Sequence, residues 1–335
     1  MIAAPPATVP AARAADLDIA RALGITLVVA GHALIGVERA LGETPGGRFA
    51  IVVIYAVHMP LFFFLSGLLA RSALTEPPRT FARRLASRFV WPYLLWSLVI
   101  LSFHASFSDV TNTRVEAVHP LRVLWAPPSV MWFLYVLGGS LALARLLRPL
   151  PVAATRAIGC ALILVGLLLA DRTPDAWLLP YLRFTGLLLI ATTLDPARIR
   201  GAAANPAARV SALVLLASGT AFAALAATAP IAGYPAAEVR YLPAAAGGIL
   251  LALAASDALA RTALAGAVAR IGRQTMPIFL THVLVLAALR IALVHAGVTD
   301  RGLILAVIIP AGVLLPLVAA GFARRLGASR LLGWS

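Results

Sequence analysis

Residues 21–32, RALGITLVVAGH, form the stretch that decides the fold class of this chain. The stretch begins with an arginine, ends with a histidine, and is almost entirely apolar between them. A membrane-spanning helix needs about 20 mostly apolar residues, and the neighbouring sequence extends the stretch to that length. Ionisable residues at such depth usually face a bundle interior or a water-filled cavity and mark functional sites. We therefore predict that the stretch crosses a membrane and contributes to a site.

The composition of the whole chain also indicates a membrane protein. Its 335 residues are 61% hydrophobic and 12% charged, whereas soluble domains have about 25% charged residues. The formal net charge of +15 could suggest a nucleic-acid partner. We expect no nucleic acid, because the basic residues, all arginine, are spread over short loops between apolar segments. The single Cys160 excludes a disulfide framework and a thiolate metal site.

Ten apolar segments approach the length of a span, so the fold class is predicted as all-α, a polytopic membrane protein with about ten transmembrane helices. The segments are 19–37, 49–70, 89–107, 130–147, 153–170, 178–194, 209–229, 243–260, 275–296 and 302–322. We expect a disordered cytoplasmic tail at 1–16, one transmembrane domain at 17–325 and a short cytoplasmic tail at 326–335. The Ala/Pro-rich N-terminus does not look like a cleaved signal peptide.

The distribution of arginines predicts the orientation of the helices. Most arginines fall in loops on one side of the ten segments, including five between residues 71 and 88, and the acidic residues are biased to the other side. Loops rich in arginine stay in the cytoplasm. An even number of helices then places both termini in the cytoplasm.

Arg21 and His32 lie on one face of the first helix, because eleven residues make about three turns. Asp18, three residues before Arg21, joins this stripe. Arg21 and His32 are separated by about 16 Å along the helix axis, which places His32 beyond the midplane of the membrane. Histidine is a common general base near neutral pH. The alternative is a His32 hydrogen-bonded between helices and an Arg21 that reaches the membrane surface.

We expect no metal at His32. No second histidine, aspartate or cysteine stands at metal-ligand spacing from it.

The segment LDIARALGITLVVAGH, residues 17–32, resembles the first helix of the acyltransferase-3 family of integral-membrane O-acyltransferases. That family has a basic residue, ten intervening residues and then a histidine, which Arg21 and His32 match. The start Asp18-x-x-Arg21 is most similar to the fucose 4-O-acetylase-like branch. Further stretches resemble family motifs in the same order: HMPLFFFLSGLL (58–69), RRLASRFVWPYLLWSL (83–98) and IGRQTMPIFLTH (271–282).

The chain departs from the family pattern at four positions. Arg84 and Arg88 stand four apart, where the family often has Arg-x-x-Arg. Thr275 and Phe279 stand where the family more usually has serine and tyrosine. We assign no catalytic role to Thr275 or Phe279.

The resemblance implies transfer of an acyl group, commonly acetyl from acetyl-CoA, to a sugar hydroxyl of a cell-surface or lipid-linked glycan. It implies a location in a bacterial inner membrane among membrane lipids, with acyl-CoA as a co-substrate and no permanently bound cofactor. His32 then acts as the general base, and a covalent acyl-histidine is the less favoured variant. Asp18 is expected to pair with Arg21 and orient it.

The remaining site residues fall into two groups. The acyl-CoA phosphates are expected to bind the guanidinium groups of four arginines. The alternative is that these arginines only set the topology of the chain. The four are Arg21, Arg83, Arg84 and Arg88. The acceptor is expected to contact two deep histidines and two aromatic residues. The alternative is that these side chains have only a structural role. The four are His58, His282, Trp132 and Tyr135.

Three other kinds of function stand as alternatives. A transporter could use the Arg21/His32 stripe as a path for protons or substrate, although no internal repeat supports this. A glycosyltransferase acting on lipid-linked sugars would need paired loop carboxylates, whereas Asp195 and Asp257 stand alone. A purely structural protein would leave the polar stripe unexplained.

Overall fold

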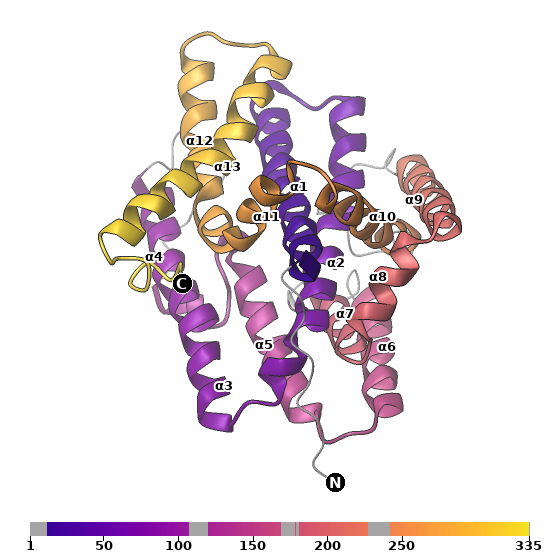
Figure 1. Ribbon diagram of the computed structural model, residues 1–335. Helices are drawn as coiled ribbons and strands as arrows, with labels where there is room; N and C mark the ends of the chain where they lie inside the picture. The colour runs from indigo at the N-terminus through magenta and orange to yellow at the C-terminus, as the bar shows by residue number, and fades with distance from the viewer. Residues whose placement is uncertain (1–11, 107–119, 169–177, 179–180, 227–241, 335) are drawn as a thin grey trace.

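The computed structural model describes residues 12–106, 120–168, 178, 181–226 and 242–334. All regular structure in this part of the chain is helical, which confirms the predicted all-α class (Figure 1). The longer helices are α1 (Ala12–Leu41), α2 (Pro45–Leu74), α4 (Trp91–Ser106), α5 (Trp132–Leu147), α6 (Val152–Leu168), α7 (Leu182–Thr192), α9 (Pro206–Ala226), α10 (Leu242–Ala260), α12 (Thr275–His295) and α13 (Arg301–Arg325). Shorter helical pieces connect them: α3 (Pro78–Leu85), α8 (Pro196–Ala204), α11 (Ala265–Arg273), the π-helical η1 (Ala86–Val90) and the 3-10 turns η2 (Pro120–Leu124) and η3 (Ser129–Met131).

Each of the ten predicted segments coincides with one of the longer helices. Among the described residues, seven helical stretches are long and apolar enough to cross a membrane, which confirms a polytopic membrane protein. Helices α6 and α7 are also apolar but shorter, and so is the part of α9 from Pro206 to Ala221. The number of helices that cross and the side of the termini stay predictions.

Helix α1 lies at the centre of the molecule and packs against α2, α10, α11, α12 and α13 (Figure 1). It is held there because its apolar residues point in several directions: Ile19, Ile25 and Val29 are almost fully buried. A helix that is apolar on most sides is stable only when other helices surround it. The stripe that carries His32 therefore faces the bundle interior.

Two glycines allow helices to approach closely at the positions that hold α1 and α2. A Cβ atom at Gly67 of α2 would lie 2.3 Å from the backbone oxygen of Leu188 in α7. A Cβ at Gly272 of α11 would lie 1.7 Å from the backbone oxygen of Asp18 in α1. No side chain fits at either place, so small residues fix these two helix contacts.

The basic segment between α2 and α4 contains a π-helical turn, η1. Pro92 follows it, and proline has no N–H to bond the carbonyl group four residues earlier. The wider turn at Ala86–Val90 accommodates this missing bond and lets α3 continue into α4.

Both ends of the described chain are ordered further than the sequence suggests. Helix α1 begins at Ala12, so part of the segment expected as a tail is helical. After α13 the chain packs on α4: the indole N–H of Trp91 donates to Leu331 O (2.8 Å) and that of Trp96 to Leu332 O (3.0 Å). Trp96 also stacks on Trp334.

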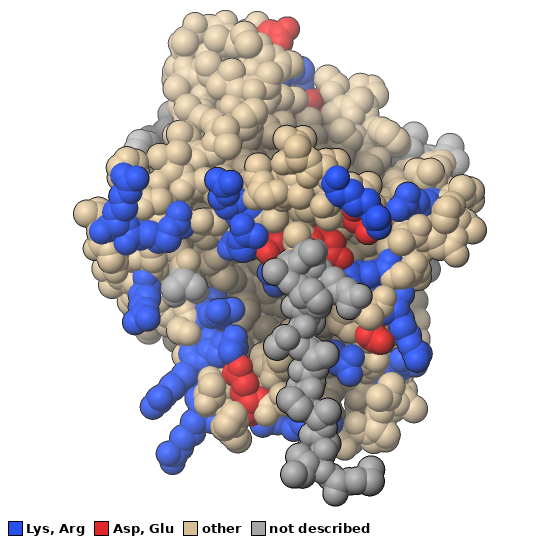
Figure 2. All heavy atoms as spheres, in the orientation of Figure 1, with Lys and Arg blue, Asp and Glu red and all other residues tan. Residues whose placement is uncertain are grey.

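Figure 2 shows basic side chains gathered over α3, α8 and α11, whereas the part of this face over the α12–α13 turn is mostly uncharged. The loops of the arginine-rich end are those that the positive-inside rule assigns to the cytoplasm. The α1–α2 and α12–α13 turns lie together at the opposite end (Figure 1). We call this opposite end the outer end.

Candidate active site

Polar side chains from three helices gather inside the bundle. His32 of α1 lies 5.3 Å from His282 of α12, measured between ring centroids. The hydroxyl oxygen of Tyr55 in α2 is 3.4 Å from His32 Nδ1, and the Tyr55 ring lies 4.6 Å from that of His58. The structure thus brings together all three histidines that the sequence singled out and adds Tyr55. The sequence contains a signal for Tyr55, because it precedes His58 by three residues on the same helix face.

Hydrogen bonds define the tautomers of two of these histidines. His58 Nδ1 lies 2.7 Å from Ile54 O, and His282 Nδ1 lies 2.7 Å from Phe279 O. A carbonyl oxygen only accepts, so Nδ1 donates in both rings, and Nε2 of the neutral ring keeps its lone pair. Nε2 of His282 is buried and has no hydrogen-bond partner in the described part of the chain. Both rings can therefore accept a hydrogen bond.

A cavity of about 1040 Å³ lies beside this cluster. It is bordered by α1, α2, α4, α5, α7, α12 and α13 and by residues 122–130, and His32, Tyr55 and His58 line it. Apart from Phe279, Val283 and Leu284 of α12, the lining residues on these helices belong to their outer halves, so the cavity extends from the cluster toward the outer end. His32 is partly exposed in it, whereas His58 and His282 are buried. A cavity of this size accommodates a ligand larger than one sugar ring.

One wall of the cavity is aromatic. Trp132 lines it and stacks on Tyr181, with 4.2 Å between ring centroids, and on Phe184. Tyr135 is not among the lining residues: its hydroxyl donates to Leu124 O (3.4 Å) and its ring packs on Tyr93. Of the two aromatic residues predicted to stack on a sugar, only Trp132 lies at the cavity.

The residues predicted to bind acyl-CoA lie at the other end of α1 or on α3 and η1. Asp18 forms ion pairs with Arg21 (3.3 Å) and with Arg273 of α11 (3.4 Å). Arg84 pairs with Glu76. The other two, Arg83 and Arg88, are exposed to solvent. None of these four predicted arginines lines the cavity.

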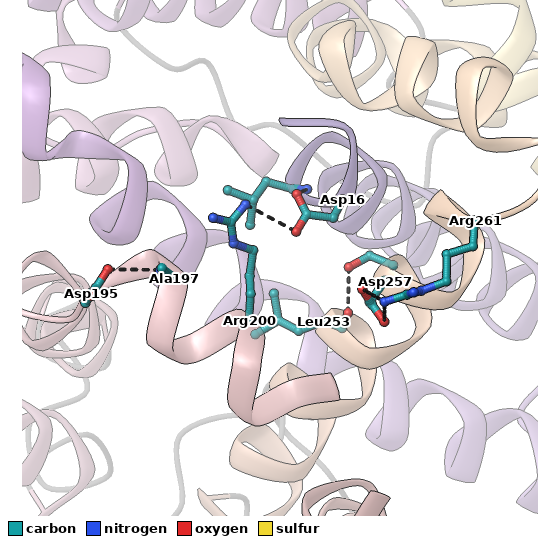
Figure 3. A network of polar contacts seen from close by, with 9 residues as sticks. Asp16, Asp195, Ala197, Arg200, Leu253, Asp257 and Arg261 are labelled. Carbon is teal, nitrogen blue, oxygen red and sulfur yellow. Dashed lines mark hydrogen bonds and ion pairs between the residues drawn. The ribbon is translucent and has the colours of Figure 1, made fainter. Parts of the chain in front are cut away.

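Figure 3 shows further ion pairs at the same end. Asp16 of α1 pairs with Arg200 of α8 (3.5 Å), and Asp257 of α10 pairs with Arg261 (2.9 Å). The carboxylate of Asp195 accepts from Ala197 N (3.0 Å) and caps α8. The two acidic residues that a glycosyltransferase would need as a pair therefore serve as a helix cap and an ion-pair partner. Among the described residues, no group of three or more metal-binding side chains is present.

Comparison with known proteins places the chain in a family. A family model described as an acyltransferase domain, Acyl_transf_3, matches residues 14–321. The chain belongs to the acyltransferase-3 family. This acyltransferase-3 protein is thus a membrane acyltransferase, and the matched range includes His32, the cavity and all four resembling motifs. Comparison with curated proteins and with solved structures gives no match. The fucose 4-O-acetylase-like branch stays a prediction.

Proposed function

We propose that this membrane acyltransferase transfers an acyl group, most simply acetyl, from cytoplasmic acyl-CoA to a sugar hydroxyl of a cell-surface or lipid-linked glycan in a bacterial inner membrane. One observation carries the proposal: His32 reaches the inner end of a cavity about 1040 Å³ in volume, within a chain of the acyltransferase-3 family. The acceptor occupies the cavity, and the thioester approaches His32 from the end of α1 that holds Arg21.

The proposed reaction needs one base and one passage for the donor. His32 takes the proton of the acceptor hydroxyl, and the oxygen attacks the thioester carbonyl carbon. The new C–O bond forms, the C–S bond breaks, and the proton passes to the departing thiolate to give free CoA. The hydroxyl of Tyr55, 3.4 Å from His32 Nδ1, is placed to hold the ring so that Nε2 faces the acceptor.

Donor binding is assigned to the arginine-rich end. An arginine fork binds a phosphate through two parallel hydrogen bonds, as the CoA nucleotide requires. Arg83 and Arg88 are exposed and accessible to it, whereas Arg84 would exchange Glu76 for phosphate. Arg21, held by Asp18, is assigned to the entrance that an extended pantetheine arm would pass. Trp132, His58 and His282 are assigned to the acceptor.

The test is transfer of label from radioactive acetyl-CoA by the purified full-length protein, with a crude glycan extract as acceptor. His32→Ala is compared with His295→Ala, because His295 is exposed at the end of α12 and lies outside the cavity. We expect the loss of His32 to reduce transfer by about 10²- to 10⁴-fold, the usual contribution of a general base. His295→Ala should transfer at the wild-type rate.

Two results would count against the proposal. Undiminished transfer by His32→Ala would remove the histidine from the chemistry. Failure of acetyl-CoA to bind or turn over would contradict the choice of donor, and transport of a substrate along the Arg21/His32 stripe would then be measured. Label retained on the wild-type protein would favour the covalent variant over direct transfer.

A further inference from the structure

The outer half of the cavity is lined by arginines, namely Arg39, Arg122, Arg183 and Arg290. No carboxylate appears among the described residues that line it. These arginines come from α1, η2, α7 and α12, so only the tertiary structure brings them together. The acyl-CoA assignment uses none of them.

Arg290 is one of the two buried arginines of this group, and Arg183 is the other. Arg290 lies on a stripe of α12 that begins with Phe279 and Val283, which also line the cavity. Its side chain is 8% exposed and packs over Gly36 of α1, where a Cβ atom would lie 3.4 Å from Arg290 Cδ and Nε. Within the described part of the chain, Arg290 forms no ion pair.

The described carboxylates at the outer end are engaged elsewhere. Glu38, 6% exposed, binds Arg301 at 3.0 Å and also accepts from Thr44. Glu43 pairs with Arg48. Asp300 caps α13 by accepting from the backbone N–H of Leu303. None of the three is bound to an arginine of the cavity.

A buried guanidinium without a counter-ion is costly, and inside a membrane protein it usually marks the path or site of a substrate. Guanidinium groups bind phosphate and carboxylate through paired, charge-assisted hydrogen bonds. We infer that the acceptor carries an oxyanion, a phosphate or a carboxylate attached to the sugar, and that Arg290 binds it with Arg39 and Arg122 at the mouth of the cavity. This inference rests on the proposed function, because it treats the cavity as the acceptor site.

The experiment measures binding of three related sugars to the full-length protein in lipid nanodiscs, without acyl-CoA. The probes are glucose, glucose 1-phosphate and glucuronate, which share a ring and differ in charge. We expect both anions to bind at least tenfold more tightly than glucose. Arg290→Gln should remove this difference in affinity and leave the affinity for glucose unchanged. Arg290→Lys, which keeps the charge, should retain most of it. A preference for one anion identifies phosphate or carboxylate as the natural group.

Arg48→Gln is the matched control, since Arg48 lies at the outer end but does not line the cavity. It should bind all three sugars like the wild type. Thermal unfolding of each variant in the same nanodiscs separates lost binding from lost folding, and Arg290→Lys provides the folded comparison if Arg290→Gln is unstable.

Equal affinity for the three sugars would overturn the inference. So would an Arg290→Gln variant that weakens binding of adenosine 3′,5′-diphosphate, the nucleotide part of CoA, and leaves the sugar anions unchanged. Failure here and failure of the proposed function are distinguishable. His32→Ala should keep the anion preference, and acetyl transfer by a protein without this preference would overturn the inference and leave the proposed reaction standing. Conversely, anion binding without acyl transfer would leave this site standing and remove the proposed reaction.

Discussion

At the scale of single residues, the hydroxyl of Tyr55 is placed to orient His32, at 3.4 Å from Nδ1. Tyr55→Phe removes this hydroxyl and keeps the ring that packs on His58. A hydrogen bond of this kind contributes about 0.5–1.5 kcal/mol, so we expect kcat to fall about 2- to 12-fold. The KM for acetyl-CoA should stay the same, because the proposed donor site lies at the other end of α1. Steady-state kinetics of acyl transfer would measure both constants.

The Tyr55→Phe result is informative only if the fold is kept. Its thermal unfolding should match that of the wild type. A change in KM with unchanged kcat would indicate that Tyr55 contacts a substrate and does not act through His32.

At the scale of helices, the contact between α2 and α7 depends on Gly67. The methyl group of Gly67→Ala would meet Leu188 O at 2.3 Å, a backbone atom that cannot move alone, so the two helices must separate. Overpacking of this kind usually costs about 1–3 kcal/mol, and we expect a lower thermal unfolding temperature in detergent. Gly139→Ala of α5 is the control, because nothing lies within 4 Å of its added Cβ. A stable Gly67→Ala protein would show that α2 and α7 are not in close contact.

At the scale of the whole molecule, the arginine bias predicts which turns face the cytoplasm. In a Cys160→Ser background, we expect Arg148→Cys, between α5 and α6, to react with a membrane-impermeant maleimide only after cells are permeabilised. Val298→Cys, between α12 and α13, should react in intact cells. The opposite pattern would reverse the orientation and place Arg290 on the cytoplasmic side. If both cysteines react in intact cells, the chain does not cross the membrane an odd number of times between residues 148 and 298.

Most of the helices could be predicted from the sequence, because burial of apolar residues in lipid is summed over each segment by itself. Helix positions and the shared face of Asp18, Arg21 and His32 follow from local spacing. Local spacing predicts length less well: α7 (Leu182–Thr192) is shorter than the expected segment 178–194. The separation of Tyr135 from the cavity depends on how α5 rotates against α4, and no local pattern contains that rotation.

The sequence by itself determined that the chain is a helical membrane protein and that His32 faces inward, because both depend on interactions within one helix. Only the tertiary structure decided that His282 and Tyr55 meet His32 and that Arg290 shares a cavity with Arg39 and Arg122. These residues come from helices far apart in the chain. Their meeting depends on close helix contacts such as those at Gly67 and Gly272, which are set by the shapes of both partners.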